Sequence, residues 1–195
     1  MMKIAIFASG NGSNFQAIVD YIKAGNLNCS VELLVCDKLN AYVIERAGNE
    51  DIPAFSFDPK AYSSKEAFET EITQQLNHYE IDFIVLAGYM RLIGPTLLSA
   101  YPNRIINIHP SLLPSFPGKD AVGQAYRAGV KVTGVTVHFV DEGMDTGPII
   151  AQKAIEVSPG ESLEDIEANI HRLEHELYPN VIANLLEKEL RGEIK

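Results

Sequence analysis

Three short segments of the chain carry polar side chains that could do chemistry. The first, GNGSN at residues 10–14, lies between an apolar run and a segment whose apolar residues repeat at helical spacing. Free backbone N–H groups and the positive end of a helix dipole favour an anion, so this loop predicts a site for a mononucleotide or sugar phosphate. Phe15 replaces the third glycine of a dinucleotide fingerprint, and no P-loop lysine follows. A tight turn capped by Ser13 or Asn14 is the alternative.

The second segment, INIHPSLLP at residues 106–114, places Asn107 and His109 on one face of a predicted strand, about 7 Å apart. They lie at the carboxyl end of that strand, where open α/β sheets bind their ligands. An imidazole beside an amide donor can stabilise an oxyanion and move a proton, which suits acyl-type transfer through a tetrahedral intermediate. A histidine that only bonds to the backbone at the strand end is the alternative.

The third segment, DEGMDTGP at residues 141–148, is an acidic turn after another strand. A carboxylate from Asp141, Glu142 or Asp145 could reach a neighbouring histidine, orient its ring and stabilise its cationic form. The sequence does not choose among the three, and a solvated acidic loop is the alternative. The spacing is not that of a calcium loop.

Two further patterns involve the last helix and the middle of the chain. His171 and His175 are four residues apart, but the glutamate of a zincin motif is missing and no third ligand has suitable spacing, so no metal is expected. Helical geometry instead groups His171, Glu174 and Tyr178 at the border of the apolar stripe, where they could face a pocket or form a solvated flank of the helix. The segment GYMRLIGP at residues 88–95 could line an apolar ligand cleft or only cap the sheet.

Apolar runs alternate with helical patterns along the whole chain. The expected strands are residues 3–8, 31–36, 53–57, 82–87, 104–109, 132–140 and 148–157. The expected helices are residues 15–25, 41–49, 64–78, 95–100, 121–128 and 162–190, the last capped by Ser162 and bent at Pro179. This alternation predicts an α/β fold, a Rossmann-like, mostly parallel sheet with helices on both faces.

Composition excludes several classes of protein. The 195 residues include 16 basic and 26 acidic side chains, a formal charge of −10, which argues against binding to nucleic acid. The first apolar run is too short for a signal peptide or a membrane span. Cys29 and Cys36 cannot form a disulfide framework and are expected as buried thiols. We expect one cytoplasmic domain, residues 1–195, that acts on small molecules as a monomer or homodimer.

Four longer segments together closely resemble the phosphoribosylglycinamide formyltransferases, or GAR transformylases, which are folate-dependent enzymes of purine synthesis. The segments are FASGNGSNFQAI, LAGYMRLIGP, NIHPSLLPSFPG and VTVHFVDEGMDTGPIIAQ. The Asn-x-His and Asp constellation is common to enzymes that use 10-formyltetrahydrofolate, while the GNGSN loop and RLEHELYP at residues 172–179 narrow the resemblance to this family.

The resemblance implies a formyltransferase fold and a reaction. The formyl group of 10-formyltetrahydrofolate would pass directly, without a metal, to the amine of glycinamide ribonucleotide in de novo purine (IMP) synthesis. The products would be N-formylglycinamide ribonucleotide and tetrahydrofolate. Residues 1–100 would form the nucleotide- and phosphate-binding half, and residues 101–195 the catalytic and folate-binding half.

The resemblance also implies roles for individual residues. His109 would be the catalytic acid, Asn107 an oxyanion donor, and Asp145 the carboxylate that stabilises the imidazolium. Gly12, Ser13 and Asn14 would bind the phosphate of the ribonucleotide and Glu174 its ribose. The folate would contact Lys65, Met90, Arg91, Leu92, Ile93, Asn107 and the loop that begins at Asp141. Lys65 replaces an arginine of some relatives, which predicts looser recognition of the folate glutamate tail.

Other functions use the same residues. A deformylase-like hydrolase would replace the amine by water at Asn107, His109 and Asp145. A nucleotide or folate sensor would keep only the binding loop. A dehydrogenase fits less well, because the third glycine and the acidic ribose partner are missing.

Overall fold

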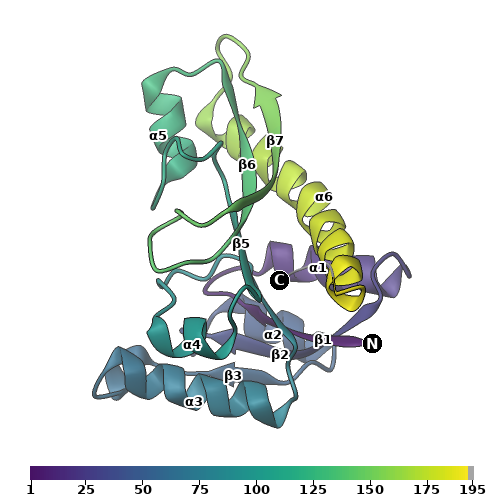
Figure 1. Ribbon diagram of the computed structural model, residues 1–195. Coiled ribbons are helices and arrows are strands. Elements are labelled where there is room, and N and C mark those ends of the chain that lie inside the picture. Colours follow the sequence, from purple (N-terminus) through teal and green to yellow (C-terminus); the bar gives the residue numbers. More distant parts are fainter. Residues whose placement is uncertain (193–195) are drawn as a thin grey trace.

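Seven strands form a single sheet in the computed structural model, which describes residues 1–192 (Figure 1). The strands are β1 (Met2–Phe7), β2 (Cys29–Cys36), β3 (Ala54–Ser56), β4 (Phe83–Leu86), β5 (Ile105–His109), β6 (Val132–Phe139) and β7 (Ile149–Glu156). The helices are α1 (Ser13–Lys23), α2 (Tyr42–Asn49), α3 (Lys65–His78), α4 (Pro95–Ala100), α5 (Ala121–Ala128) and α6 (Leu163–Leu190), with a 3₁₀ turn at η1 (Pro59–Ala61).

The strand order is β3-β2-β1-β4-β5-β6-β7. The first five strands in this order pair in parallel, whereas β6 pairs antiparallel with both β5 and β7. The predicted mostly parallel α/β sheet is therefore confirmed. All predicted strands and helices are present, with ends within about two residues of the predicted ones, as is usual for element boundaries.

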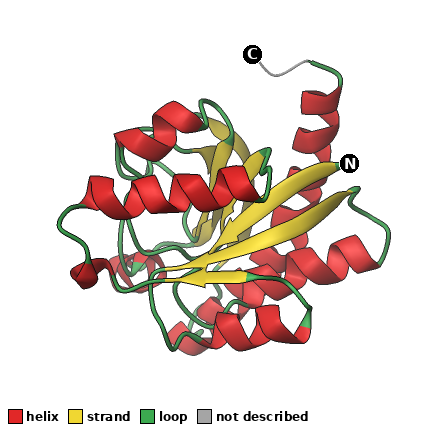
Figure 2. Cartoon of the chain, turned by 90° about the horizontal axis from the view of Figure 1, so that it is seen from below, coloured by secondary structure: helices red, strands yellow, loops and turns green. Residues whose placement is uncertain are grey.

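Helices cover both faces of the sheet, as Figure 2 shows. Ile4 and Ile6 of β1 belong to the core that contains residues of α1, α2 and α6. Ala5 and Phe7 belong to the opposite core, which contains residues of α3 and α4. This alternation follows from the period of two residues in a strand, and it explains why β1 is apolar without interruption.

The long helix α6 closes the first core. Ser162 and Asp165 form the expected capping box at its start, and the helix continues through Pro179. Tyr178 is completely buried, and its hydroxyl donates to the carbonyl oxygen of Leu86 at 2.8 Å and lies 3.3 Å from that of Ile106. A single side chain of α6 thus bonds to both β4 and β5.

We expect Tyr178→Phe to lower the free energy of unfolding by about 1–3 kcal/mol, because two buried carbonyl groups lose a shared donor. Urea denaturation measures the change. Tyr21→Phe is the matched control, since the Tyr21 hydroxyl donates to Asn180 at the surface, and it is expected to change stability by less than about 0.5 kcal/mol. Equal losses in the two variants would contradict the bonding role of the buried hydroxyl.

The topology brings three loops to one edge of the sheet. Residues 8–12, 87–94 and 110–120 follow the carboxyl ends of β1, β4 and β5, which are neighbours in the sheet. The loop after β5 contains a cis peptide bond between Leu113 and Pro114. Among residues 1–192, no helix is long and apolar enough to cross a membrane.

Candidate active site

Asn107, His109 and Asp145 meet at the carboxyl end of β5. Ile106 and Ile108 point into the core beneath α1 and α6, so Asn107 and His109 share the opposite face of the strand, as expected. His109 is 5% exposed. Its Nδ1 lies 3.4 Å from Oδ2 of Asp145, and its Nε2 lies 2.9 Å from the carbonyl oxygen of Phe116. Both neighbours accept hydrogen bonds, so a doubly protonated ring satisfies both.

Asp145 joins the two loops that flank His109. Its Oδ2 accepts the backbone N–H of Gly118 at 2.8 Å, and its backbone adopts a left-handed φ of 56°. Burial by itself would raise the pKa of this carboxyl. The nearby His138 ring, the N–H of Gly118 and the charge of His109 outweigh burial, so the pKa of Asp145 lies below its ordinary value. This carboxyl is therefore ionised at neutral pH.

The other two acidic residues of the 141–148 loop have different environments. Oδ1 of Asp141 accepts the backbone N–H of Gly143 at 3.0 Å and the hydroxyl of Thr146 at 2.7 Å, so it shapes its own loop. Glu142 is exposed. Of the three carboxylates that the sequence left open, Asp145 is the one that reaches His109 and His138.

His138 is a member of the site that the sequence did not identify. It is 2% exposed and lies directly across from Asn107 in the β5–β6 pairing. In the neutral ring, Nδ1–H donates to the carbonyl oxygen of Phe139 at 2.7 Å and Nε2 accepts from Nδ2 of Asn107 at 3.2 Å. In the protonated ring, Nε2 carries a proton and faces Oδ1 of Asp145 at 3.7 Å instead. The contact of the neutral ring with Asn107 fixes the orientation of the Asn107 amide. Only the pairing of β5 with β6, read together with the face of His138, could have revealed it.

The GNGSN loop connects β1 to α1. Within residues 1–192, the N-cap residue of α1 supplies no side chain to the N–H groups of this loop. The N-cap residue is Gly12, at φ 78°, and it makes no side-chain cap hydrogen bond, so the alternative of a turn capped by Ser13 or Asn14 is wrong. Helix α2 supports the loop from behind, since Arg46 donates to the backbone oxygen of Asn11 at 2.8 Å and to its Oδ1 at 3.0 Å. Anion binding at this loop stays a prediction, and the uncapped start of α1 is compatible with it.

Asn14 and Glu174, 160 residues apart in the chain, are brought together at this loop. Nδ2 of Asn14 donates to Oε2 of Glu174 at 3.2 Å, while the buried Oδ1 of Asn14 has no partner. Glu174 is 6% exposed, and burial raises its pKa despite the Asn14 hydrogen bond and the nearby His171. A buried polar atom without a partner and a buried carboxyl together suit a polar ligand with hydroxyl groups.

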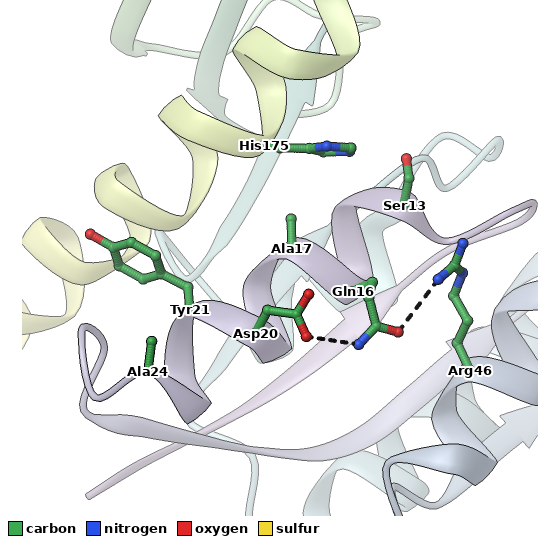
Figure 3. A pocket seen from close by; sticks show the side chains of 8 residues that line it. All are labelled: Ser13, Gln16, Ala17, Asp20, Tyr21, Ala24, Arg46 and His175. Atoms are coloured by element: carbon green, nitrogen blue, oxygen red, sulfur yellow. Dashed lines mark hydrogen bonds between the residues drawn. The ribbon is translucent and has the colours of Figure 1, made fainter.

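His175 is a second residue that the sequence reasoning did not place at a ligand site. It lines a pocket of about 540 Å³ that begins at Ser13 and follows α1, where the imidazole lies above the helix (Figure 3). Its Nε2 is buried and unpartnered, and its ring stacks on that of His171. The expectation that Tyr178 faces a pocket is wrong, because its hydroxyl bonds to the sheet instead. The pocket does not include the residues around His109.

The residues expected to contact folate differ in exposure. Met90 and Leu92 are 66% and 44% exposed, which leaves apolar surface free at the edge of the sheet, whereas Ile93 is buried in the core. Arg91 forms an ion pair with Asp37 through its Nε at 2.8 Å. Lys65 begins α3, is half-exposed, and has its Nζ 3.9 Å from Glu69. Exposed apolar side chains together with the half-exposed ammonium group of Lys65, which also pairs with Glu69, fit a flat ring system with an acidic tail.

Within residues 1–192, no group of three or more His, Cys, Asp or Glu side chains has an arrangement that could hold a metal ion. His171 and His175 lie side by side, as their spacing predicted. Their ring centroids are 6.5 Å apart, and the two ring planes are nearly parallel, with an interplanar angle of 12°.

The sequence matches the Formyl transferase family over residues 2–182. It is 64% identical to the phosphoribosylglycinamide formyltransferase of Bacillus subtilis (strain 168) over 193 residues, which cover 99% of each chain. The crystal structure of glycinamide ribonucleotide transformylase 1 from Geobacillus kaustophilus is similar with a TM-score of 0.93 and 65% identity, covering 95% of this chain and 99% of that one. The phosphoribosylglycinamide formyltransferase structure from Bacillus halodurans has a TM-score of 0.93 at 58% identity, covering 96% of both chains.

Proposed function

Because the chain belongs to the formyl transferase family, among its phosphoribosylglycinamide formyltransferases, we propose that it transfers a formyl group from 10-formyltetrahydrofolate to the amine of glycinamide ribonucleotide in purine biosynthesis. The observation that carries the proposal is the contact of Asp145 with His109, beside Asn107, at the end of β5. This arrangement suits an acyl transfer in which negative charge develops on the formyl oxygen.

In the proposed mechanism the neutral amine attacks the formyl carbon, and the new C–N bond forms as the carbonyl electrons move onto oxygen. Asn107 donates its remaining Nδ2–H to that oxyanion, because His138 accepts the other one. His109 donates a second hydrogen bond through Nε2, at the position where Phe116 now supplies an acceptor. Asp145 stabilises the imidazolium from the Nδ1 side.

The proton balance completes the transfer. The attacking nitrogen loses one proton and the leaving nitrogen of the folate gains one, and the bond between the formyl carbon and that nitrogen breaks as the oxyanion collapses. Asp145 holds the water through which we propose this proton moves, since it is ionised and adjacent to His109. No covalent bond to the enzyme is needed.

We propose that the ribonucleotide binds with its phosphate at Gly12, Ser13 and Asn14 and its ribose at Glu174, supported by the Asn14 contact and by the unpartnered Oδ1. Folate binds along Met90, Arg91 and Leu92 with its acidic tail toward Lys65. The backbone of Ile93 and the loop at Asp141 complete that site. Each site then uses both halves of the chain, 1–100 and 101–195.

The test of the function is an incubation of the purified protein with 10-formyltetrahydrofolate, with and without glycinamide ribonucleotide, in the presence of a chelator. We expect formylated ribonucleotide to form, and the chelator should not lower the rate. Product analysis and folate absorbance measure the reaction. Formate released without the ribonucleotide would instead identify a deformylase. Binding of either ligand without turnover would identify a sensor.

Glu174→Gln is expected to weaken ribonucleotide binding by about 10- to 100-fold, the value of a hydrogen bond to a charged group. It should also stabilise the free protein at pH 8. The folded state holds the Glu174 proton more tightly than the unfolded state, so wild-type stability falls as pH rises from the ordinary value near 4.5 through the raised pKa, and then stays lower. Glutamine removes that dependence.

Calorimetry of ribonucleotide binding and melting midpoints at pH 4 and pH 8 measure both effects. The melting temperature of Glu174→Gln minus that of the wild type should be more positive at pH 8 than at pH 4. Glu176→Gln is the matched control, because Glu176 is exposed on the same helix and pairs with Lys153 at the surface. If the difference in melting temperature between Glu174→Gln and the wild type did not change with pH, burial would not raise the pKa of Glu174 in the folded protein.

We further propose that the chain acts in the cytoplasm as a single domain, monomeric or homodimeric, on small molecules rather than nucleic acid. Cys29 and Cys36 are buried free thiols, and burial raises the pKa of Cys29 to about 12. Free, unreactive thiols are usual in a reducing compartment. Light scattering of the purified protein measures the oligomeric state.

A further inference from the structure

A buried carboxylate outside the reaction centre joins two segments of the carboxyl edge. Asp37 directly follows β2 and is 6% exposed. Its Oδ1 accepts the hydroxyl of Ser9 at 2.5 Å, and its Oδ2 accepts the Nε–H of Arg91 at 2.8 Å. A buried charge is tolerated only where it is paired and hydrogen-bonded. The buried carboxylate of Asp37 therefore needs the contacts with Ser9 and Arg91.

Ser9 extends this contact to the backbone of the neighbouring loop. It is 1% exposed, and its hydroxyl oxygen accepts the N–H of Met90 at 2.9 Å. Its own backbone N–H donates to the carbonyl oxygen of Gly88 at 3.1 Å. The Arg91 guanidinium also lies over the ring of Phe68, 5.8 Å from the centroid. Ser9 and Asp37 therefore hold the 88–91 segment through both side chain and backbone.

Ser9, Asp37 and Arg91 connect the two segments that are proposed to bind the substrates. Ser9 immediately precedes the phosphate loop at residues 10–14, and Met90 and Arg91 belong to the proposed folate segment. The three strands that carry the cluster, β2, β1 and β4, are adjacent in the sheet. A displacement of either ligand-binding segment must therefore strain the hydrogen bonds that hold the other.

We propose that Ser9, Asp37 and Arg91 are positioning residues that couple the two substrate sites, so that the bound ribonucleotide increases the affinity for folate and the reverse. This inference rests on the proposed function and adds that the affinity of each substrate site depends on whether the other site is occupied. A ligand that fixes one segment also fixes the other through the cluster, and the second ligand then loses less free energy in ordering its own site. Such coupling is reciprocal by thermodynamic necessity.

The experiment uses glycinamide ribonucleotide with tetrahydrofolate, a pair that lacks the formyl group and cannot react. Calorimetry gives the Kd of tetrahydrofolate without ribonucleotide and with saturating ribonucleotide. In the wild type we expect the second Kd to be about 5- to 20-fold lower. Asp37→Asn and Ser9→Ala should each reduce this factor to below about 2, and the double variant should reduce it no further, because both act through the same contacts.

Glu80→Gln is the matched control. It removes a carboxylate that pairs with Lys3 of β1 at the opposite, amino end of the strand, and the coupling factor should stay at the wild-type value. Equal Kd values in the wild type, or a retained factor in Asp37→Asn and Ser9→Ala, would overturn the proposal. Weaker binding of both ligands with the factor unchanged would give the cluster a purely structural role. Failure of the wild type to bind either ligand would instead count against the proposed function.

Discussion

His109→Ala is expected to lower kcat for formyl transfer by about 100- to 1,000-fold, with the fold retained. The side chain supplies one of two donors to the developing oxyanion, and loss of one such donor typically has this effect. Because His109 lies between Asp145 and Phe116 and not in the main core, its removal leaves the sheet contacts intact. Steady-state kinetics at saturating substrates and far-ultraviolet circular dichroism measure the two parts of the prediction.

The matched control is His78→Ala, since His78 is an exposed histidine at the end of α3 whose ring lies edge-on to that of Tyr79, outside the site. Its kcat should equal that of the wild type. Asn107→Ala should lose activity to a similar extent as His109→Ala, because it removes the other donor. Wild-type turnover in either active-site variant would remove that residue from the mechanism.

Gly12→Ala is expected to raise the KM for glycinamide ribonucleotide by about 10-fold or more. The backbone of Gly12 has a φ of 78°, which disfavours a side chain by roughly 1–2 kcal/mol. An added Cβ would also lie 2.5 Å from Cγ2 of Val43 in α2, so the loop must move away from its present position. Displaced N–H groups no longer converge on the phosphate.

A second substitution separates the two causes. Val43→Gly in the Gly12→Ala background removes Cγ2 and Cβ of Val43, which would lie 2.5 and 2.7 Å from the added Cβ, but leaves the backbone strain, so it should restore part of the affinity for the ribonucleotide. Gly48→Ala is the control, since an added Cβ at this helical glycine meets no atom within 4 Å. An unchanged KM in Gly12→Ala would mean that the loop does not bind the phosphate.

Much of the fold was predictable because local patterns determine it. The apolar runs and helical spacings give each strand and helix, and strand alternation alone places Asn107 and His109 on one face. The choice of Asp145 over Asp141 was not predictable from spacing. It depends on the path of the 141–148 loop, in which Asp141 bonds to Gly143 and Thr146.

Two other features depend on tertiary contacts that a linear pattern does not contain. His138 reaches Asn107 only because β6 returns antiparallel in one particular register. Tyr178 lies at the border of the apolar stripe of α6, and helical periodicity does not say whether a hydroxyl there finds water or a backbone carbonyl. In the fold it finds Leu86 and Ile106, so the polar atom is buried.

The left-handed backbone of Asp145 restricts which amino acids can replace it. A φ of 56° is tolerated by glycine, asparagine and aspartate much better than by other residues. The contact with His109 requires a negative charge, which only aspartate and glutamate carry. Aspartate is the one residue in both sets, so a library of all amino acids at position 145 should yield full activity with aspartate alone, with asparagine preserving the loop and glutamate preserving the charge.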